Sequence, residues 1–135
     1  MADKTAFAGA ADGGVRQMLR LEGLLLLGGA TALFWRGGGD WRLFAALFLV
    51  PDISFAFYLA GPRLGAAAYN AMHSTIGPLL LAAAGLAFGQ PLAVAVGCIW
   101  FAHVGFDRAL GYGLKHARGF AFTHLGRIGR KPREN

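Results

Sequence analysis

Charge and cysteine are both scarce in this sequence. Only 15% of its 135 residues are charged, while 56% are hydrophobic. A soluble domain has about 25% charged residues, so the balance favours a membrane protein. The single cysteine, Cys98, excludes an intramolecular disulfide, and it leaves too few thiolates for an iron–sulfur cluster. The net charge of +6 comes mostly from basic residues that flank apolar runs, which does not indicate a nucleic-acid partner.

Long apolar runs, separated by short turns containing glycine, make up most of the chain. They cover residues 19–35, 41–61, 64–88 and 92–114. About 20 apolar residues suffice to cross a bilayer, and short loops make successive helices antiparallel neighbours. We therefore expect an all-α fold, an integral membrane bundle of four antiparallel transmembrane helices with short loops. Residues 16–114 would form this domain, between a disordered tail at 1–15 and a basic cytoplasmic tail at 115–135.

Lysine and arginine predict the orientation of these helices. Four spans place both termini and the 61–63 turn on one side, which carries most of the basic residues. The other side has only Arg36 and Arg42. Both termini should therefore be cytoplasmic, in a multi-pass protein of the cell inner membrane whose partners include membrane lipids. We expect the tail to pack on the cytoplasmic face with Phe120 and Phe122 inserted, and Tyr69 to join a cytoplasmic aromatic belt.

Several polar side chains lie inside the apolar runs, where ionisable groups are costly and are candidates for function. His103 and Asp107 are four residues apart, so they share one helix face. At a rise of about 1.5 Å per residue, polar groups of several helices reach similar depths. These residues are Asp52, His73 and His103 near mid-membrane, Ser54, Asn70 and Asp107 nearer the cytoplasm, and Glu22 nearest. The shared depth predicts one inward-facing polar site.

Histidine with carboxylate ligands suits a divalent metal, zinc first and iron second. The expected metal ligands are His73, His103, Asp52, Asp107 and Glu22. The candidate catalytic residues are Asp52, Ser54, Asn70 and Asp107, since hydroxyl and amide groups can orient ligands or donate to a developing oxyanion. The spacing matches no zinc-protease motif. No residues are assigned to any cofactor other than a metal.

Three functions fit this pattern. The first is an intramembrane metal-dependent hydrolase that acts on a lipid or amphiphile from the cytoplasmic side. The second is a transporter or proton-coupled carrier, which would need a homo-oligomer because four short spans are few for alternating access. The third is a non-catalytic membrane module whose His/Asp pairs are structural. Whether the protein is an enzyme, and its substrate and oligomeric state, stay open at this point.

Three blocks of the sequence are distinctive: LFLVPDISFAFYLAGPRLGAAAYNAMH, WFAHVGFDRALGYGLK and FTHLGRIGR. Together they resemble the domain of unknown function 4260 family. The resemblance covers about residues 19–130 and implies a small bacterial integral membrane protein, without implying a metal or a reaction. The pattern of histidine, aspartate and serine on several helices also resembles, in architecture only, that of integral-membrane zinc hydrolases.

Overall fold

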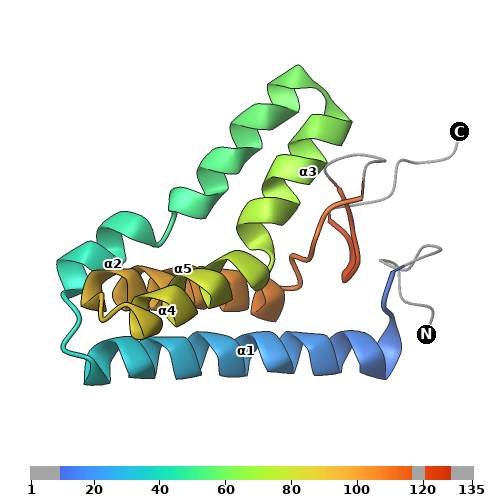
Figure 1. The fold of residues 1–135 in the computed structure, drawn as a ribbon. Helices are drawn as coiled ribbons and strands as arrows, with labels where there is room; N and C mark the ends of the chain where they lie inside the picture. Colours follow the sequence, from blue (N-terminus) through green and yellow to red (C-terminus); the bar gives the residue numbers. More distant parts are fainter. Residues whose placement is uncertain (1–9, 117–120, 129–135) are drawn as a thin grey trace, which may run out of the picture.

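The fold is given by a computed structural model that describes residues 10–116 and 121–128. Apart from two short strands, the elements of this part of the chain are helical (Figure 1). They are α1 (Gly13–Arg36), α2 (Trp41–Leu47), the 3-10 helix η1 (Val50–Ala60), α3 (Pro62–His73), α4 (Ile76–Ala87), α5 (Pro91–Leu110), β1 (Phe122–Thr123) and β2 (Gly126–Arg127).

Local chemistry sets many of the helix ends. The Asp40 carboxylate caps α2 by accepting a 2.8 Å hydrogen bond from the Arg42 N–H. Pro62 and Pro91 open α3 and α5, where the missing proline N–H would have had no helical partner. Gly111 ends α5 with a φ of 91°, a left-handed conformation that favours glycine.

Three helical stretches of the described chain are long and apolar enough to cross a membrane: Gly13–Arg36, Trp41–Ala60 and Pro91–Leu110. Many large apolar side chains on them are exposed, including Leu25, Leu33 and Leu59. An exposed apolar surface of this kind suits lipid rather than water. The structure therefore supports a membrane protein.

The third expected span is not one helix. Its residues form α3 and α4, and the chain between them is extended at Ser74, which has a ψ of 158°. Pro78 explains the break, because a proline ring clashes with the carbonyl four residues earlier, here that of Ser74. The structure thus has three stretches long and apolar enough to span a membrane, and a broken pair of shorter helices where the sequence predicted the third of four spans.

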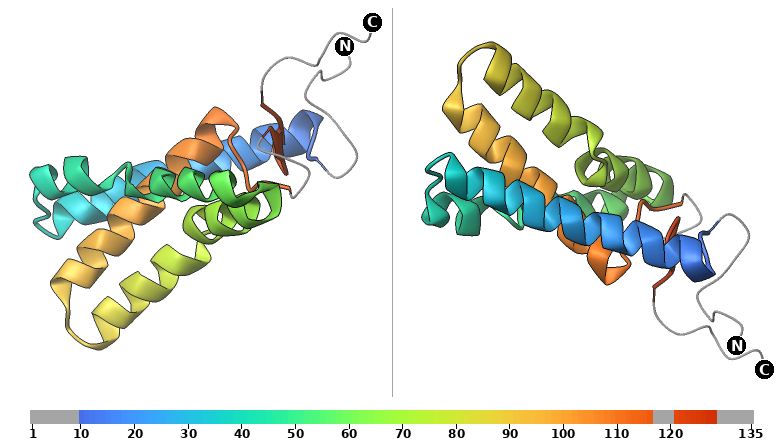
Figure 2. Two further views of the ribbon diagram at one scale, coloured as in Figure 1. Left: turned by 90° about the horizontal axis from the view of Figure 1, so that it is seen from above. Right: turned by 90° about the horizontal axis from the view of Figure 1, so that it is seen from below.

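Glycines allow α1 and α5 to lie side by side (Figures 1 and 2). A Cβ added to Gly105 of α5 would come within 2.5 Å of the Leu27 nitrogen and 2.6 Å of the Gly23 oxygen on α1. On the other side of α5, a Cβ on Gly97 would meet Ala82 of α4. Small residues let helix backbones approach closely in membranes. The three helices α1, α4 and α5 therefore form one tightly packed unit.

The second unit is the helical hairpin of η1 and α3, which lies apart from α1 in Figure 1. Its two helices pack mainly against each other, joined by Gly61 with a φ of 119°. Side chains of α5 reach across to it. The Trp100 Nε1–H donates to the Met72 carbonyl at 2.6 Å, and Arg108 Nη2 donates to the His73 carbonyl at 3.2 Å.

The chain after α5 returns to the start of α1 and packs there. Thr123 and Leu125 are fully buried, the Arg16 guanidinium donates to the Leu125 carbonyl, and the Ala11 N–H donates to the His124 carbonyl at 2.7 Å. Both described ends therefore lie at one end of the molecule (Figure 1).

Phe122, which was expected to insert at the surface, is half-buried beneath the Arg127 guanidinium, 5.4 Å from its ring centroid. Phe120 lies outside the described residues. His124 Nδ1 accepts a hydrogen bond from the Leu114 N–H at 2.8 Å. Burial, reinforced by the nearby Arg108 cation, lowers the pKa of His124, so this imidazole stays neutral and keeps that bond.

Candidate metal centre

Four ionisable residues from three helices meet at one point in the protein. Asp52 lies in the first turn of η1, His73 ends α3, and His103 and Asp107 lie one turn apart on α5. Each offers one ligand atom, and no two of these atoms are more than 4.8 Å apart. His73, His103 and Asp107 are buried, whereas the Asp52 side chain is 34% exposed. The convergence expected from the sequence is observed for these four residues, which we call the centre.

The spacing of the ligand atoms suits a single ion. The two Nε2 atoms of His73 and His103 are 3.1 Å apart. From these nitrogens to Asp52 Oδ1 the distances are 3.2 and 3.3 Å, and to Asp107 Oδ2 they are 3.3 and 3.4 Å. Ligands about 2.0–2.2 Å from a tetrahedral zinc ion lie about 3.3–3.6 Å from one another. The five separations that involve a histidine nitrogen therefore fall in or close to this range, and the two carboxylate oxygens lie within 4.8 Å of each other.

The hydrogen bond of His73 Nδ1 indicates that the Nε2 atom, which faces the centre, carries a lone pair. His73 Nδ1 lies 2.9 Å from the Tyr69 carbonyl, which can only accept, so Nδ1 carries the proton of the neutral ring. The Nε2 lone pair then faces the carboxylates of Asp52 and Asp107 and the His103 nitrogen. Such a group of acceptors needs protons or a cation at its middle. Metal-binding histidines commonly donate their other nitrogen to a carbonyl in this way.

Tyr69 holds two members of the centre in place. Its ring stacks on the His73 imidazole with 3.7 Å between centroids and 8° between planes. Its hydroxyl donates to Asp107 Oδ2 at 3.4 Å. The sequence predicted Tyr69 in an aromatic belt and did not indicate its contacts with His73 and Asp107. The signal available was the spacing of four residues from His73, which puts both rings on one face of α3.

The remaining predicted site residues do not join the centre. Glu22 is exposed on α1. Ser54 is buried, and its hydroxyl donates to the Pro51 carbonyl at 2.7 Å. Asn70 accepts from the Lys115 N–H at 2.6 Å and donates to the Lys115 carbonyl at 2.8 Å, so it anchors the chain that follows α5. The amide and the hydroxyl are thus engaged by backbone groups.

A cavity of about 300 Å³ adjoins the centre, and we call it the centre cavity. Asp52, Asp107, Tyr69 and Lys115 contribute polar groups to its wall. The rest of the wall is Phe55, Phe106, Leu110, Tyr112 and Ile128. Burial lowers the pKa of Lys115 to about 8.

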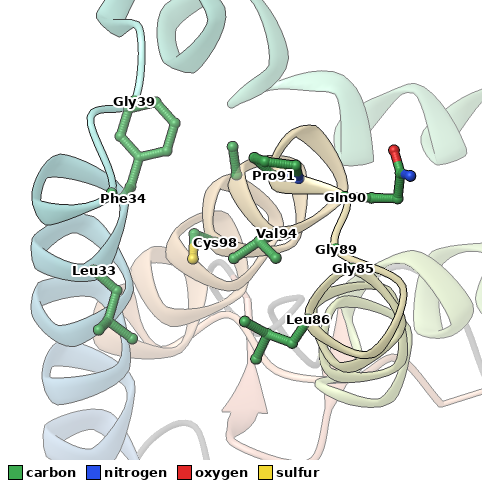
Figure 3. Close-up of a pocket in the computed structure, with 12 residues that line it drawn as sticks. Leu33, Phe34, Gly39, Gly85, Leu86, Gly89, Gln90, Pro91, Val94 and Cys98 are labelled. Atoms are coloured by element: carbon green, nitrogen blue, oxygen red, sulfur yellow. The ribbon is translucent and has the colours of Figure 1, made fainter.

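A second cavity, of about 320 Å³, lies among α1, α4 and α5 (Figure 3). Leu33, Phe34, Leu86, Val94 and Cys98 surround it from these three helices. None of its lining residues, all within the described chain, is charged. This second cavity therefore offers no charged group for binding an ion or for catalysis.

Comparison with known proteins identifies the family. A family model described as a domain of unknown function, DUF4260, matches residues 16–128, which include all four residues of the centre. No curated protein and no solved structure matches the chain. The family match covers most of the sequence and agrees with the resemblance seen in its three distinctive blocks. The chain therefore belongs to the family of the domain of unknown function DUF4260.

Proposed function

We propose that this protein is an integral membrane protein that binds one divalent metal ion, zinc in preference to iron, at the centre and uses it to hydrolyse an amphiphilic substrate. The observation that carries the proposal is the convergence of two imidazole nitrogens and two carboxylate oxygens, with each nitrogen 3.1–3.4 Å from the other three atoms. Zinc prefers this geometry and these ligands. Two carboxylates and a divalent cation would also cancel in charge, which relieves the cost of burying them.

The exposure of the two carboxylates suggests different roles for them. Asp107 is buried and held by Tyr69, as befits a ligand fixed beside His73 and His103. Asp52 is the more exposed carboxylate and lines the centre cavity. Three firm protein ligands would leave the fourth position for water, as in catalytic zinc sites. Asp52 then lies where a general base could take a proton from that water.

The ion would supply Lewis acidity, polarising a carbonyl or phosphoryl oxygen of the substrate and acidifying the attacking water. The protein's own contributions are an oriented base and a largely apolar cavity that limits access of bulk water. Hydrolysis of an ester or phosphoester bond at the cavity wall is the reaction that this arrangement suits best.

The proposed setting is a multi-pass inner-membrane protein with both termini in the cytoplasm. Its support is the exposed apolar surface of the three long apolar stretches and, in the sequence, the excess of lysine and arginine outside the apolar runs on the side predicted to hold both termini. In this arrangement α3 and α4 together make the fourth passage. A topology reporter fused after Asn135 should read as cytoplasmic, and an external reading would refute the orientation.

Metal analysis of the purified protein, before any metal is added, tests the centre directly. We expect about one zinc ion per chain in the wild type. The variant His103→Ala should lose the ion, whereas Asp52→Asn should keep it and lose hydrolysis of a chromogenic ester or phosphodiester. Asp12→Asn, which removes an exposed carboxylate outside the centre, is the matched control. It should change neither the zinc content nor the rate of hydrolysis.

Metal-free wild-type protein would refute the proposal, provided that cobalt or zinc added afterwards also fails to bind. That result, with His103→Ala less stable than the wild type, would favour a structural role for the His/Asp pairs.

A further inference from the structure

The centre cavity has one cation among its lining residues, Lys115, and its position is tightly constrained. The Lys115 backbone is clamped on both sides by the Asn70 amide, and it also pairs with Thr123. Its ammonium lies 4.9 Å from the Tyr69 ring centroid and 5.9 Å from that of Phe55. Lys115 is 4% exposed and its backbone is held by three contacts. It is therefore a fixed residue of the cavity wall and not a solvated lysine of the protein surface.

The charges that line the cavity depend on the metal. Without an ion, the carboxylates of Asp52 and Asp107 outweigh the single ammonium of Lys115, so the cavity is negative. A divalent ion at the centre offsets the two carboxylates, which leaves the Lys115 ammonium as the remaining charged group among the lining residues that the structure describes. The complementary ligand is therefore a single negative charge on oxygen, which both the ion and the lysine attract.

The remaining wall is mostly apolar, and part of it reaches the exposed surface of α5. Phe55, Phe106, Leu110 and Ile128 line the cavity, and Phe106 and Leu110 lie one turn apart on α5. Phe106 is 38% exposed and Leu110 is 48% exposed, on a helix long and apolar enough to span a membrane. The cavity volume of about 300 Å³ is at the lower limit for ligand pockets, enough for a head group and the carbons beside it. The rest of an alkyl chain could lie along Phe106 and Leu110 in the lipid.

We propose that the centre cavity binds an amphiphile with a singly charged oxyanion head, a phosphodiester or a carboxylate. The head lies between Lys115 and the metal, and the alkyl chain leaves past Phe106 and Leu110. This inference rests on the proposed metal centre, and it names the substrate class that the centre acts on.

The test uses full-length protein in neutral detergent with cobalt in place of zinc, because cobalt reports its ligands by visible absorption. Four probes are titrated at one fixed micelle concentration. They are methyl octyl phosphate, octanoate, octyltrimethylammonium and dimethyl phosphate. Octyltrimethylammonium carries a positive head group in place of a negative one. Dimethyl phosphate keeps the phosphodiester head group but lacks the octyl chain.

We expect the two anionic amphiphiles to shift the cobalt spectrum and the cationic one to leave it unchanged. Dimethyl phosphate should bind about tenfold or more weakly than methyl octyl phosphate, because each buried methylene strengthens binding about fourfold. Lys115→Gln should lower the affinity for the anionic amphiphiles about tenfold or more, as expected for the loss of one charge-assisted hydrogen bond. Lys115→Arg should largely restore binding. Arg63→Gln, which makes the same charge change at an exposed site on α3, should have no effect.

The outcomes separate the two proposals. Cobalt that fails to bind overturns the metal centre and this inference with it. Cobalt that binds while octyltrimethylammonium binds as well as octanoate overturns only the inference. So does a Lys115→Gln variant that keeps its cobalt spectrum and its affinity for both anions. Equal binding of dimethyl phosphate and methyl octyl phosphate would assign the site to free oxyanions rather than to amphiphiles.

Discussion

Zinc should stabilise the folded protein by fastening the η1–α3 hairpin to α5. The ligand atoms come from three helices and lie within 4.8 Å of one another only when the hairpin is docked. An ion that binds the folded state alone adds RT ln(1 + [L]/Kd) to the free energy of unfolding. With free zinc at about 100 times its dissociation constant, the gain is about 2.7 kcal/mol.

The assay compares chelator-stripped protein with and without zinc in neutral detergent, unfolding it reversibly with an anionic detergent. Hydrogen exchange locates the gain. We expect added protection in residues 50–73, where few backbone contacts to other elements hold the hairpin, and little change in α1, which packs on α5 through glycines. His103→Ala should abolish the zinc-dependent increment. An equal increment in that variant, or a uniform gain along the whole chain, would refute the reasoning.

Three further predictions concern positions around the centre. Gly105→Ala should destabilise the protein by about 1–3 kcal/mol, because its Cβ would strike the backbone of α1; Gly28→Ala, which faces open space, should be neutral or stabilising in the same unfolding assay. Tyr69→Phe should weaken zinc about tenfold in a competition titration with a chelator, because it frees Asp107 but keeps the stacked ring. The pKa of His124 is lower in the folded protein than in the unfolded chain, so the unfolded chain binds more protons in acid. Stability should therefore be full above a pH of about 6.5 and decrease as the pH falls below it; His124→Gln should flatten that slope, and an unchanged slope would contradict the assignment.

The position of each polar residue along its helix could be predicted from the sequence. Counting residues from the ends of the apolar runs placed Asp52, His73, His103 and Asp107 in adjoining layers, and the structure brings these four together. The count works because each helix has a nearly fixed rise per residue. The same count also admitted Glu22, which is exposed on α1. Depth does not reveal the direction in which a side chain leaves its helix.

The sequence did not predict correctly on which face of its helix each polar side chain lies. Val50–Ala60 is a 3-10 helix with about 3.0 residues per turn instead of 3.6, so the faces of this segment cannot be assigned from an α-helical pattern. Asp52 faces the centre, while Ser54, two residues later, donates to the Pro51 carbonyl. The side chain of Asn70 is bound by the Lys115 backbone, a contact that depends on a return of the chain after α5 that no periodicity predicts.

The break between α3 and α4 explains why the centre lies where it does. A helix that ends inside a bilayer leaves carbonyl groups without helical partners, and these must be satisfied by protein. At the end of α3, Trp100 donates to the Met72 carbonyl and Arg108 donates to the His73 carbonyl. Both donors lie on α5, on either side of His103 in the sequence.

The segment of α5 that supplies two ligands of the centre thus also satisfies the end of the helix that supplies a third. An unbroken helix through residue 74 would engage the last carbonyls of α3 in its own hydrogen bonds. Trp100 and Arg108 would then not bind these carbonyls, and the end of α3 would lose its contacts with α5 at Met72 and His73. Pro78, by ending α3 at His73, is therefore part of what positions the residues of the centre, although it lies outside the centre.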